Sequence, residues 1–276
     1  MSEFVRVPET DWQDILDATR DKTGSTEKML SGEVATAIAG IQTGGSDDIA
    51  RALVDRSITE YRDDTIKSVG DSAFRRCGNL TNVQLPSAER IGNEAFAYCA
   101  NIVSIDLPNA TTAGAGAFTN CSSLVNLNLP KVSVIGGNCF DQCKELVRIV
   151  LPSLTTVTTN SNMIFRGCVK LKTLDTYISG GALASYALNG CNNLTQLILR
   201  GTGEICRLAA SSSIGGTPIA NGTGYVYVPR ALLSDDDETK DYRRATNWTV
   251  YATQFRALED YTVDGTITGE LDESKI

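Results

Sequence analysis

Eight cysteines and the absence of histidine define the chemistry that this sequence could perform. Six of the cysteines recur at intervals of 22, 22, 22, 25 and 23 residues, namely Cys77, Cys99, Cys121, Cys143, Cys168 and Cys191. If each interval is one layer of a stack, neighbouring thiols lie about 4.8 Å apart in a straight column. A disulfide needs Cβ atoms about 3.8 Å apart, and zinc needs four convergent ligands. We therefore expect a column of buried, reduced thiols, which also suits synthesis in a reducing compartment.

Two features leave the state of other cysteines open. Cys139 and Cys143 stand four residues apart in one repeat and could pair with each other. Cys206 falls outside the register altogether. The spacing alone does not decide whether these three thiols are free.

No set of residues in the chain suggests catalysis. Without histidine, serine and cysteine nucleophiles lose their usual general base, and the acidic residues are scattered without an evident acid and base pair. The acidic segment Ser234–Asp241 does not follow the spacing of an EF-hand loop. We predict that the protein is not an enzyme and holds neither a cofactor nor a metal ion.

Composition limits the partners. The 276 residues carry a net charge of −8, which argues against nucleic acid because binding to phosphates needs lysine and arginine. No apolar run reaches the ~18 residues of a membrane-spanning helix. The first residues lack the basic and apolar regions of a secretory signal, so we expect no signal peptide and a water-soluble protein.

The residues around each cysteine repeat with it and define the elements that position it. A phenylalanine stands three residues before each of the first five, at Phe74, Phe96, Phe118, Phe140 and Phe165. Leucine or isoleucine follows three residues later, and then a pair of apolar residues separated by one residue, which is followed by proline in four repeats. Alternation predicts a short strand, and a fixed period of this length is typical of a solenoid. The sequence predicts an α/β solenoid, with short parallel strands on one face and short helical turns, such as Asp71–Arg76, on the other.

The repeat pattern (I/V)G-x-x-A-F-x-x-C-x-x-L-x-x-(I/L)-x-L-P resembles the BspA-like, or Treponema-type, leucine-rich repeat over Val69–Leu199. Four units match closely. The fifth has an insertion around Thr158–Asn162 and lacks the proline, and the sixth has Leu188 in place of phenylalanine. The resemblance implies a leucine-rich-repeat solenoid that binds other molecules.

The two ends differ from the repeats. The segment around Arg20–Gly24, together with Met29 and Ile41, resembles the helical leader of tail-associated proteins from phages and prophages of gut Firmicutes. Gly224–Tyr261 resembles the closing segment of phage-encoded leucine-rich repeat proteins, and its aromatic residues predict a helical stripe that covers the last repeat. The expected units are a helical attachment module (1–45), a linker and N-cap (46–65), the solenoid (66–205), a C-terminal cap (206–262) and an acidic tail (263–276).

The strand positions that alternate with the core predict an extended binding face, because solenoids use such surfaces for recognition. The candidate residues are Asn82, Gln84, Ser104, Asp106, Asn126, Asn128, Arg148, Val150, Thr173, Asp175, Gln196 and Ile198. The leading hypothesis is a phage virion protein of the tail, baseplate or fibre. Its N-terminal helices would contact other virion proteins, and its solenoid would bind a host surface protein or glycan. A BspA-like adhesin on the bacterial cell surface and an intracellular scaffold are the alternatives, and homo-oligomers are possible in each.

Overall fold

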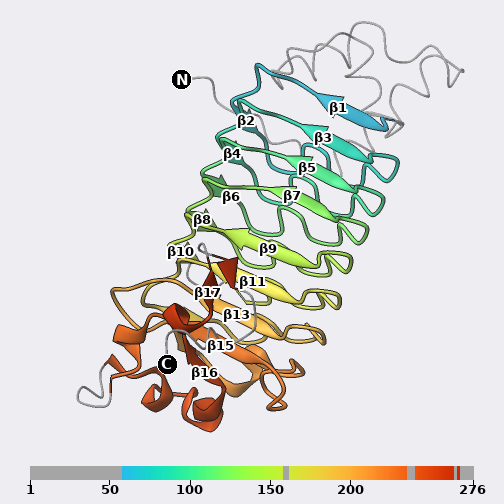
Figure 1. The fold of residues 1–276 in the computed structure, drawn as a ribbon. Helices are drawn as coiled ribbons and strands as arrows, with labels where there is room; N and C mark the ends of the chain where they lie inside the picture. Colours follow the sequence, from blue (N-terminus) through green and yellow to red (C-terminus); the bar gives the residue numbers. More distant parts are fainter. Residues whose placement is uncertain (1–57, 158–161, 235–239, 264–265, 268–276) are drawn as a thin grey trace, which may run out of the picture.

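The computed structural model describes residues 58–157, 162–234, 240–263 and 266–267, and these form an elongated stack of layers (Figure 1). Each regular layer contributes one strand to a front ladder, turns a corner, and contributes a two-residue strand to a second ladder. The predicted attachment module, residues 1–45, lies outside the described residues. The solenoid expected from the period is confirmed.

The front ladder consists of two parallel sheets. One sheet contains β1 (Glu60–Arg62), β3 (Asn82–Gln84), β5 (Ser104–Asp106) and β7 (Asn126–Asn128), in that order. The other contains β9 (Arg148–Leu151), β11 (Thr173–Thr176), β13 (Gln196–Leu199), β15 (Tyr225–Val228) and β16 (Phe255–Ala257). Within each sheet of the repeat region, every strand pairs with its neighbour one repeat away, so equivalent residues stand side by side. This parallel pairing of equivalent residues confirms the short parallel strands that the sequence predicts.

The second ladder consists of two-residue strands, each of which comes just before a segment of the kind predicted as a helical turn. It contains β2 (Ser68–Val69), β4 (Arg90–Ile91), β6 (Thr112–Ala113), β8 (Val134–Ile135) and β10 (Thr156–Val157), followed by β12 (Ala182–Leu183) and β14 (Arg207–Leu208) as a separate pair. Among the described residues, turns follow β2, β4, β6, β8 and β12, a 3-10 segment, η1 (Ser211–Ile214), follows β14, and none of these segments is an α-helix. The expectation of a helical face was therefore wrong.

The backbone of these turns explains the difference. In the Asp71–Arg76 segment the N–H groups of Ser72, Phe74 and Arg76 donate to carbonyl oxygens of the next layer, at 2.7–2.8 Å. Ser72 and Arg76 have φ values of 58° and 62°, in the left-handed region that interrupts a right-handed helix. Because donors that a helix would use internally bond between layers, this segment joins the stack together.

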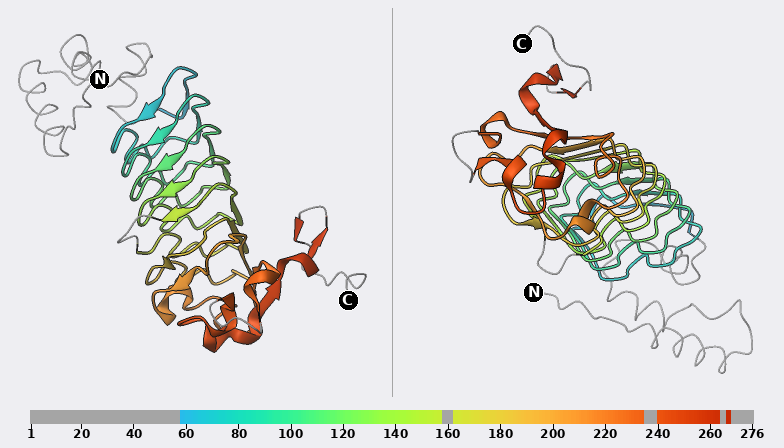
Figure 2. Two further views of the ribbon diagram at one scale, coloured as in Figure 1. Left: turned by 90° about the vertical axis from the view of Figure 1, so that its left-hand side faces the viewer. Right: turned by 90° about the horizontal axis from the view of Figure 1, so that it is seen from below.

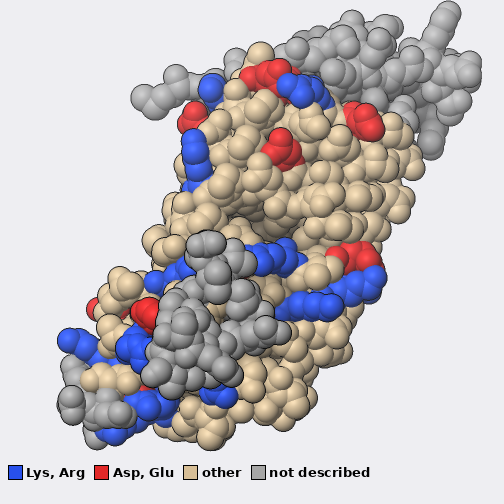
Figure 3. Space-filling view, viewed as in Figure 1, with Lys and Arg blue, Asp and Glu red and all other residues tan. Residues whose placement is uncertain are grey.

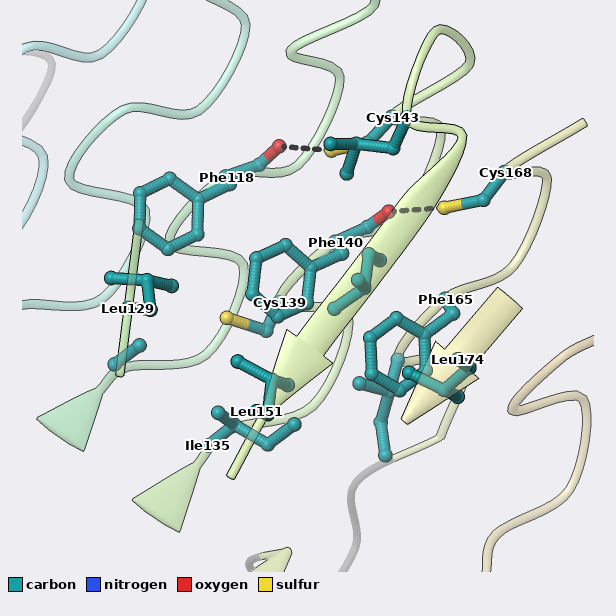
Figure 4. Packing of buried hydrophobic residues seen from close by; sticks show 14 of the residues in the cluster. Phe118, Leu129, Ile135, Cys139, Phe140, Cys143, Leu151, Phe165, Cys168 and Leu174 are labelled. Carbon is teal, nitrogen blue, oxygen red and sulfur yellow. Dashed lines mark hydrogen bonds between the residues drawn. The ribbon is translucent and has the colours of Figure 1, made fainter. Parts of the chain in front are cut away.

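The core runs the length of the stack and consists of columns of equivalent residues, one from each layer. The phenylalanine rings of successive repeats stack with centroids 5.0–5.7 Å apart and planes within 10° of parallel. Figure 4 shows three of them beside the leucine side chains of the front ladder. The leucine column from Leu80 to Leu194 is fully buried. The predicted phenylalanine and leucine columns are confirmed.

The C-terminal cap buries its aromatic residues without forming the predicted helix. Tyr242 and Trp248 are fully buried, and Phe255 nearly so. They lie on or beside two 3-10 segments, η4 (Tyr242–Arg244) and η5 (Thr249–Gln254), and on β16. The chain extends at Ala245, with ψ of 147°, so no continuous helix spans the cap. The Tyr242 hydroxyl accepts from the Cys206 N–H and the Trp248 indole donates to the Cys206 carbonyl, which anchors the cap on the solenoid.

Candidate functional site

The cysteine column is a structural feature of the core. All eight cysteines are free and buried, including Cys139, Cys143 and Cys206. In five layers the thiol donates a hydrogen bond of 2.9–3.1 Å to the phenylalanine carbonyl of the preceding layer. Figure 4 shows two of these bonds, from Cys143 to Phe118 and from Cys168 to Phe140. Each thiol therefore satisfies a buried acceptor as well as filling space.

Burial also makes these thiols poor nucleophiles. Desolvation raises the pKa of Cys121 and Cys139 well above the usual value for a thiol. Burial raises the pKa of Cys206 to about 12. Because the thiolate is the reactive form, thiols that stay protonated at neutral pH are inert. The column offers no catalytic group.

The front ladder carries the residues expected to bind a partner. The structure places eight of the twelve predicted side chains on β3, β5, β7 and β9 with at least partial exposure, at Asn82, Gln84, Ser104, Asp106, Asn126, Asn128, Arg148 and Val150. We call this set the open face. The Asn128 amide donates to the Asp106 carboxylate at 2.7 Å, and the Gln84 carbonyl accepts from Arg62 at 2.8 Å. The open face is thus a row of aligned polar groups that ends at an arginine and a valine.

The remaining four predicted residues do not form a free surface. Thr173, Asp175 and Ile198 are only 8%, 4% and 1% exposed, and Gln196 is half-buried. Asp175 accepts two hydrogen bonds from Arg200, at 2.6 and 2.9 Å. The side chains of Thr173, Asp175 and Ile198 on β11 and β13 therefore lack the exposure that the predicted binding face assumes.

The C-terminal segment explains the burial of Ile198. After β16 the chain turns over the outward side of the second sheet, where Leu258 and Tyr261 pack against Ile198 and Tyr227. The Tyr227 and Tyr261 rings meet edge to face at 5.3 Å. Figure 2 shows this end of the chain standing out from the stack. A strand pattern alone cannot reveal that a distant segment folds back over it.

A hollow of about 260 Å³ lies at the end of the open face, between β7 and β9. Its lining comes from the two strands and the prolines that follow them: Leu127, Asn128, Leu129, Pro130, Arg148, Val150 and Pro152. Figure 3 shows this side of the molecule, with basic side chains gathered across its middle. Asn128, Arg148 and Val150 were predicted as binding residues, so the structure brings three predicted residues together around one depression.

One feature of this surface was not predicted. Val103, Val125 and Val147 recur 22 residues apart, immediately before the front strands, and are 42%, 46% and 44% exposed. Side chains at equivalent positions of paired strands stack along the solenoid, so the valines form an apolar row beside the open face. Their period was visible in the sequence. What hid them was the assumption that recurring apolar residues belong to the core.

The described residues contain no group of three or more potential metal ligands. The acidic segment Ser234–Asp241 has its residues 235–239 outside the described part. Among the described residues, no helix has the length and apolar character that crossing a bilayer requires.

Comparisons with known proteins agree with the repeat pattern. The family model described as the BspA type leucine rich repeat region matches residues 67–195 in 6 copies. No curated protein matches the chain.

Several solved structures are similar to this chain. The leucine-rich repeat protein of T. pallidum is 32% identical, with 48% of this chain and 62% of that chain covered and a TM-score of 0.45. A leucine rich cell surface protein from Faecalibacterium prausnitzii is 17% identical, with coverage of 63% and 57% and a TM-score of 0.35. A leucine-rich repeat protein from Bacteroides ovatus is 14% identical, with coverage of 64% of each chain and a TM-score of 0.26. The chain spans less than two thirds of the length of each of these proteins.

The match of the family model covers the same layers whose phenylalanine, cysteine and leucine columns form the core of the stack. The period, the columns and the family model describe one architecture. Residues 67–195 of this chain therefore match the BspA type leucine rich repeat region.

Proposed function

We propose that the protein is a non-enzymatic binding module whose open face contacts a partner molecule. The observation that carries the proposal is the set of eight accessible side chains on four consecutive parallel layers. Solenoids use extended surfaces of this kind for recognition. All eight cysteines are buried, and desolvation raises the pKa of Cys121 and Cys139.

The composition of the surface favours a protein partner over a glycan. The open face carries amide, hydroxyl, carboxylate and guanidinium groups, and no aromatic ring to stack on a sugar. The adjoining valine row adds apolar area, with Val125 46% exposed. Polar groups beside a strip of apolar side chains are typical of protein interfaces.

We propose further that this module belongs to a phage virion, as a component of the tail, baseplate or fibre. The resemblance of residues around Arg20–Gly24 and of Gly224–Tyr261 to phage-associated segments supports this placement. In this arrangement the N-terminal residues contact other virion proteins and the solenoid faces the host. Mass spectrometry of purified particles tests the placement, and absence of the chain from the particles would refute it.

A bacterial surface adhesin is the second candidate, because the repeats are of the BspA type. The binding face would be the same, and only the location of the protein, on the bacterial surface or on the virion, would differ. Antibody labelling of intact bacteria that carry the gene, without phage induction, distinguishes the two. Surface labelling in the absence of particles favours the adhesin, whereas labelling restricted to released particles favours the virion.

The open face itself is tested by site-specific photo-crosslinking. A photoreactive residue at position 126 on β7 is compared with one at position 112 on β6 of the second ladder. We expect crosslinks to a partner on the host cell or particle from position 126 and none from position 112. Equal crosslinking from both positions would show that the open face is not the contact surface.

A further inference from the structure

The front ladder is interrupted between β7 and β9. In the regular layers a backbone carbonyl accepts from the first residue of the next strand: Thr81 from Ser104 at 3.2 Å, and Val103 from Asn126 at 3.0 Å. Within the described part of the chain the equivalent bond from Arg148 to Val125 is absent, and β7 and β9 belong to separate sheets.

The other side of the same junction is also unpaired. The Leu107 N–H donates to the Asn128 carbonyl at 3.1 Å, but the Leu129 N–H has no acceptor among the described residues. Two neighbouring strand edges therefore face each other with free backbone donors and acceptors. Unpaired N–H and C=O groups at a strand edge can form hydrogen bonds with the backbone of another chain.

The interruption is local to the front ladder. Behind it, the rings of Phe118 and Phe140 stack at 5.3 Å, and the Cys143 thiol reaches the Phe118 carbonyl at 3.1 Å. The second ladder pairs without a break from β6 through β8 to β10. The stack is therefore continuous in its core, and at this junction it opens only on the side of the open face.

The opening uncovers part of the core. Leu127, at the centre of β7, is partly exposed, whereas the equivalent Val83, Ile105 and Ile149 are at most 2% exposed. Leu127 and Leu129 line one wall of the hollow, and Arg148 and Val150 line the other. The site thus combines free strand edges, apolar side chains and one cation.

The charge of the site points to an acidic ligand. Arg148 is exposed and has no ion pair with the described residues. Lys144 and Lys172, which are also exposed, add positive charge in the neighbouring turns, although the whole chain carries −8. An arginine guanidinium binds a carboxylate with two parallel hydrogen bonds, which also fixes the orientation of the ligand.

We propose that an extended segment of a partner protein, carrying an aspartate or glutamate, docks in the hollow between β7 and β9. From the open face, its backbone groups hydrogen-bond to the unpaired Val125 carbonyl and Leu129 N–H, and its carboxylate binds Arg148. A peptide backbone presents donors and acceptors in the alternation that a strand edge requires, which a glycan does not. This inference rests on the proposed binding function and specifies the class of partner and the layers it contacts.

A displayed library of random dodecapeptides provides the test, with the full chain as bait. Peptides selected on the wild type are expected to be rich in Asp or Glu and to bind Arg148→Glu about tenfold more weakly or worse. Arg90→Glu, the same change on the exposed part of β4, is the matched control and should bind like the wild type. Failure to enrich peptides, or equal binding to Arg148→Glu, would overturn the proposal.

The rate of hydrogen exchange at the Leu129 amide tests whether this strand edge is unpaired. In the free protein the amide of Leu129 should exchange faster than that of Leu107, which is bonded to Asn128. A selected peptide should slow exchange at Leu129 and leave Leu107 unchanged, whereas slow exchange at Leu129 without peptide would refute the opening. If position 126 crosslinks to a partner that binds Arg148→Glu normally, the proposed function stands and this inference fails.

Discussion

At the scale of single residues, the repeated cysteine is an internal hydrogen-bond donor. Each phenylalanine carbonyl in the column accepts from the cysteine N–H of its own layer and from the thiol of the next layer, as at Phe118. A side chain at this position must be small, apolar in bulk and able to donate. Cysteine meets all three conditions, which explains its recurrence without any catalytic role.

Thiol labelling tests this account. We expect none of the eight cysteines to react with a thiol reagent at pH 7 in the native protein, because all are buried and desolvation raises the pKa of Cys121 and Cys139. All eight should react in denaturant. Rapid labelling of any cysteine in the folded state, measured by mass spectrometry, would contradict the sealed column.

The phenylalanine column should dominate the free energy of unfolding. Phe118 is fully buried between Phe96 and Phe140, with ring centroids 5.7 and 5.3 Å away. Phe118→Ala should lower the free energy of unfolding by about 3–5 kcal/mol, because it leaves a cavity that the neighbouring layers cannot fill. Val125→Ala, at a site 46% exposed, is the control and should change it by less than about 0.5 kcal/mol. Denaturant titration of both variants gives the comparison, and similar midpoints would argue against the column as a main source of stability.

At the scale of the elements, close approach between layers determines where glycine is required. A Cβ atom on Gly114 would lie 2.6 Å from the Asn93 backbone nitrogen. Gly70 occupies the same repeat position one layer before Gly92, and a Cβ atom added there would meet none of the described residues within 4 Å. The glycine of the repeat is thus needed where a described turn of the preceding layer lies against it.

This difference gives a matched pair of substitutions. Gly114→Ala should destabilise the protein by about 1–3 kcal/mol, because the added methyl group forces two backbones apart. Gly70→Ala should be nearly neutral or slightly stabilising, since alanine restricts the unfolded chain. Thermal unfolding of the two variants tests this, and an equal loss of stability in both would refute the close-approach explanation.

The elements also show what the sequence could predict. The phenylalanines that recur from Phe74 to Phe165 predicted the layers and their register. The alternation in Asn82–Gln84 predicted the strand, because successive side chains of a strand point to opposite faces. The second ladder was missed because its strands are two residues long and their hydrogen bonds run between layers. The recurring apolar residue before glycine, as in Ile91 and Ile135, was the available signal.

The cap illustrates a different difficulty. The aromatic spacing from Tyr242 to Phe255 fits one helix, yet the structure has two 3-10 segments and a strand there. The hydrogen bonds of Tyr242 and Trp248 to Cys206 fix these residues against the last layers. Tertiary contacts of this kind override a local period, so the burial was predictable and the helix was not.

At the scale of the whole molecule, the front of the stack divides into two parts. Layers from β3 to β9 present the open face, whereas Ile198 of β13 lies beneath the C-terminal segment and Asp175 of β11 is bound by Arg200. The hollow marks the boundary between the two parts. We propose that a binding partner contacts this surface of limited length, which ends at Arg148.

The most direct measurement is the binding of fluorescently labelled protein to cells of the bacterium that carries the gene, quantified by flow cytometry. We predict that replacing both Asn126 and Asn128 on β7 with glutamate abolishes binding while the unfolding temperature stays unchanged. The control replaces Thr112 and Val134, on β6 and β8 of the second ladder, with glutamate and should bind like the wild type. Binding that survives the first pair of substitutions, or that is lost equally in both, would contradict recognition through the open face.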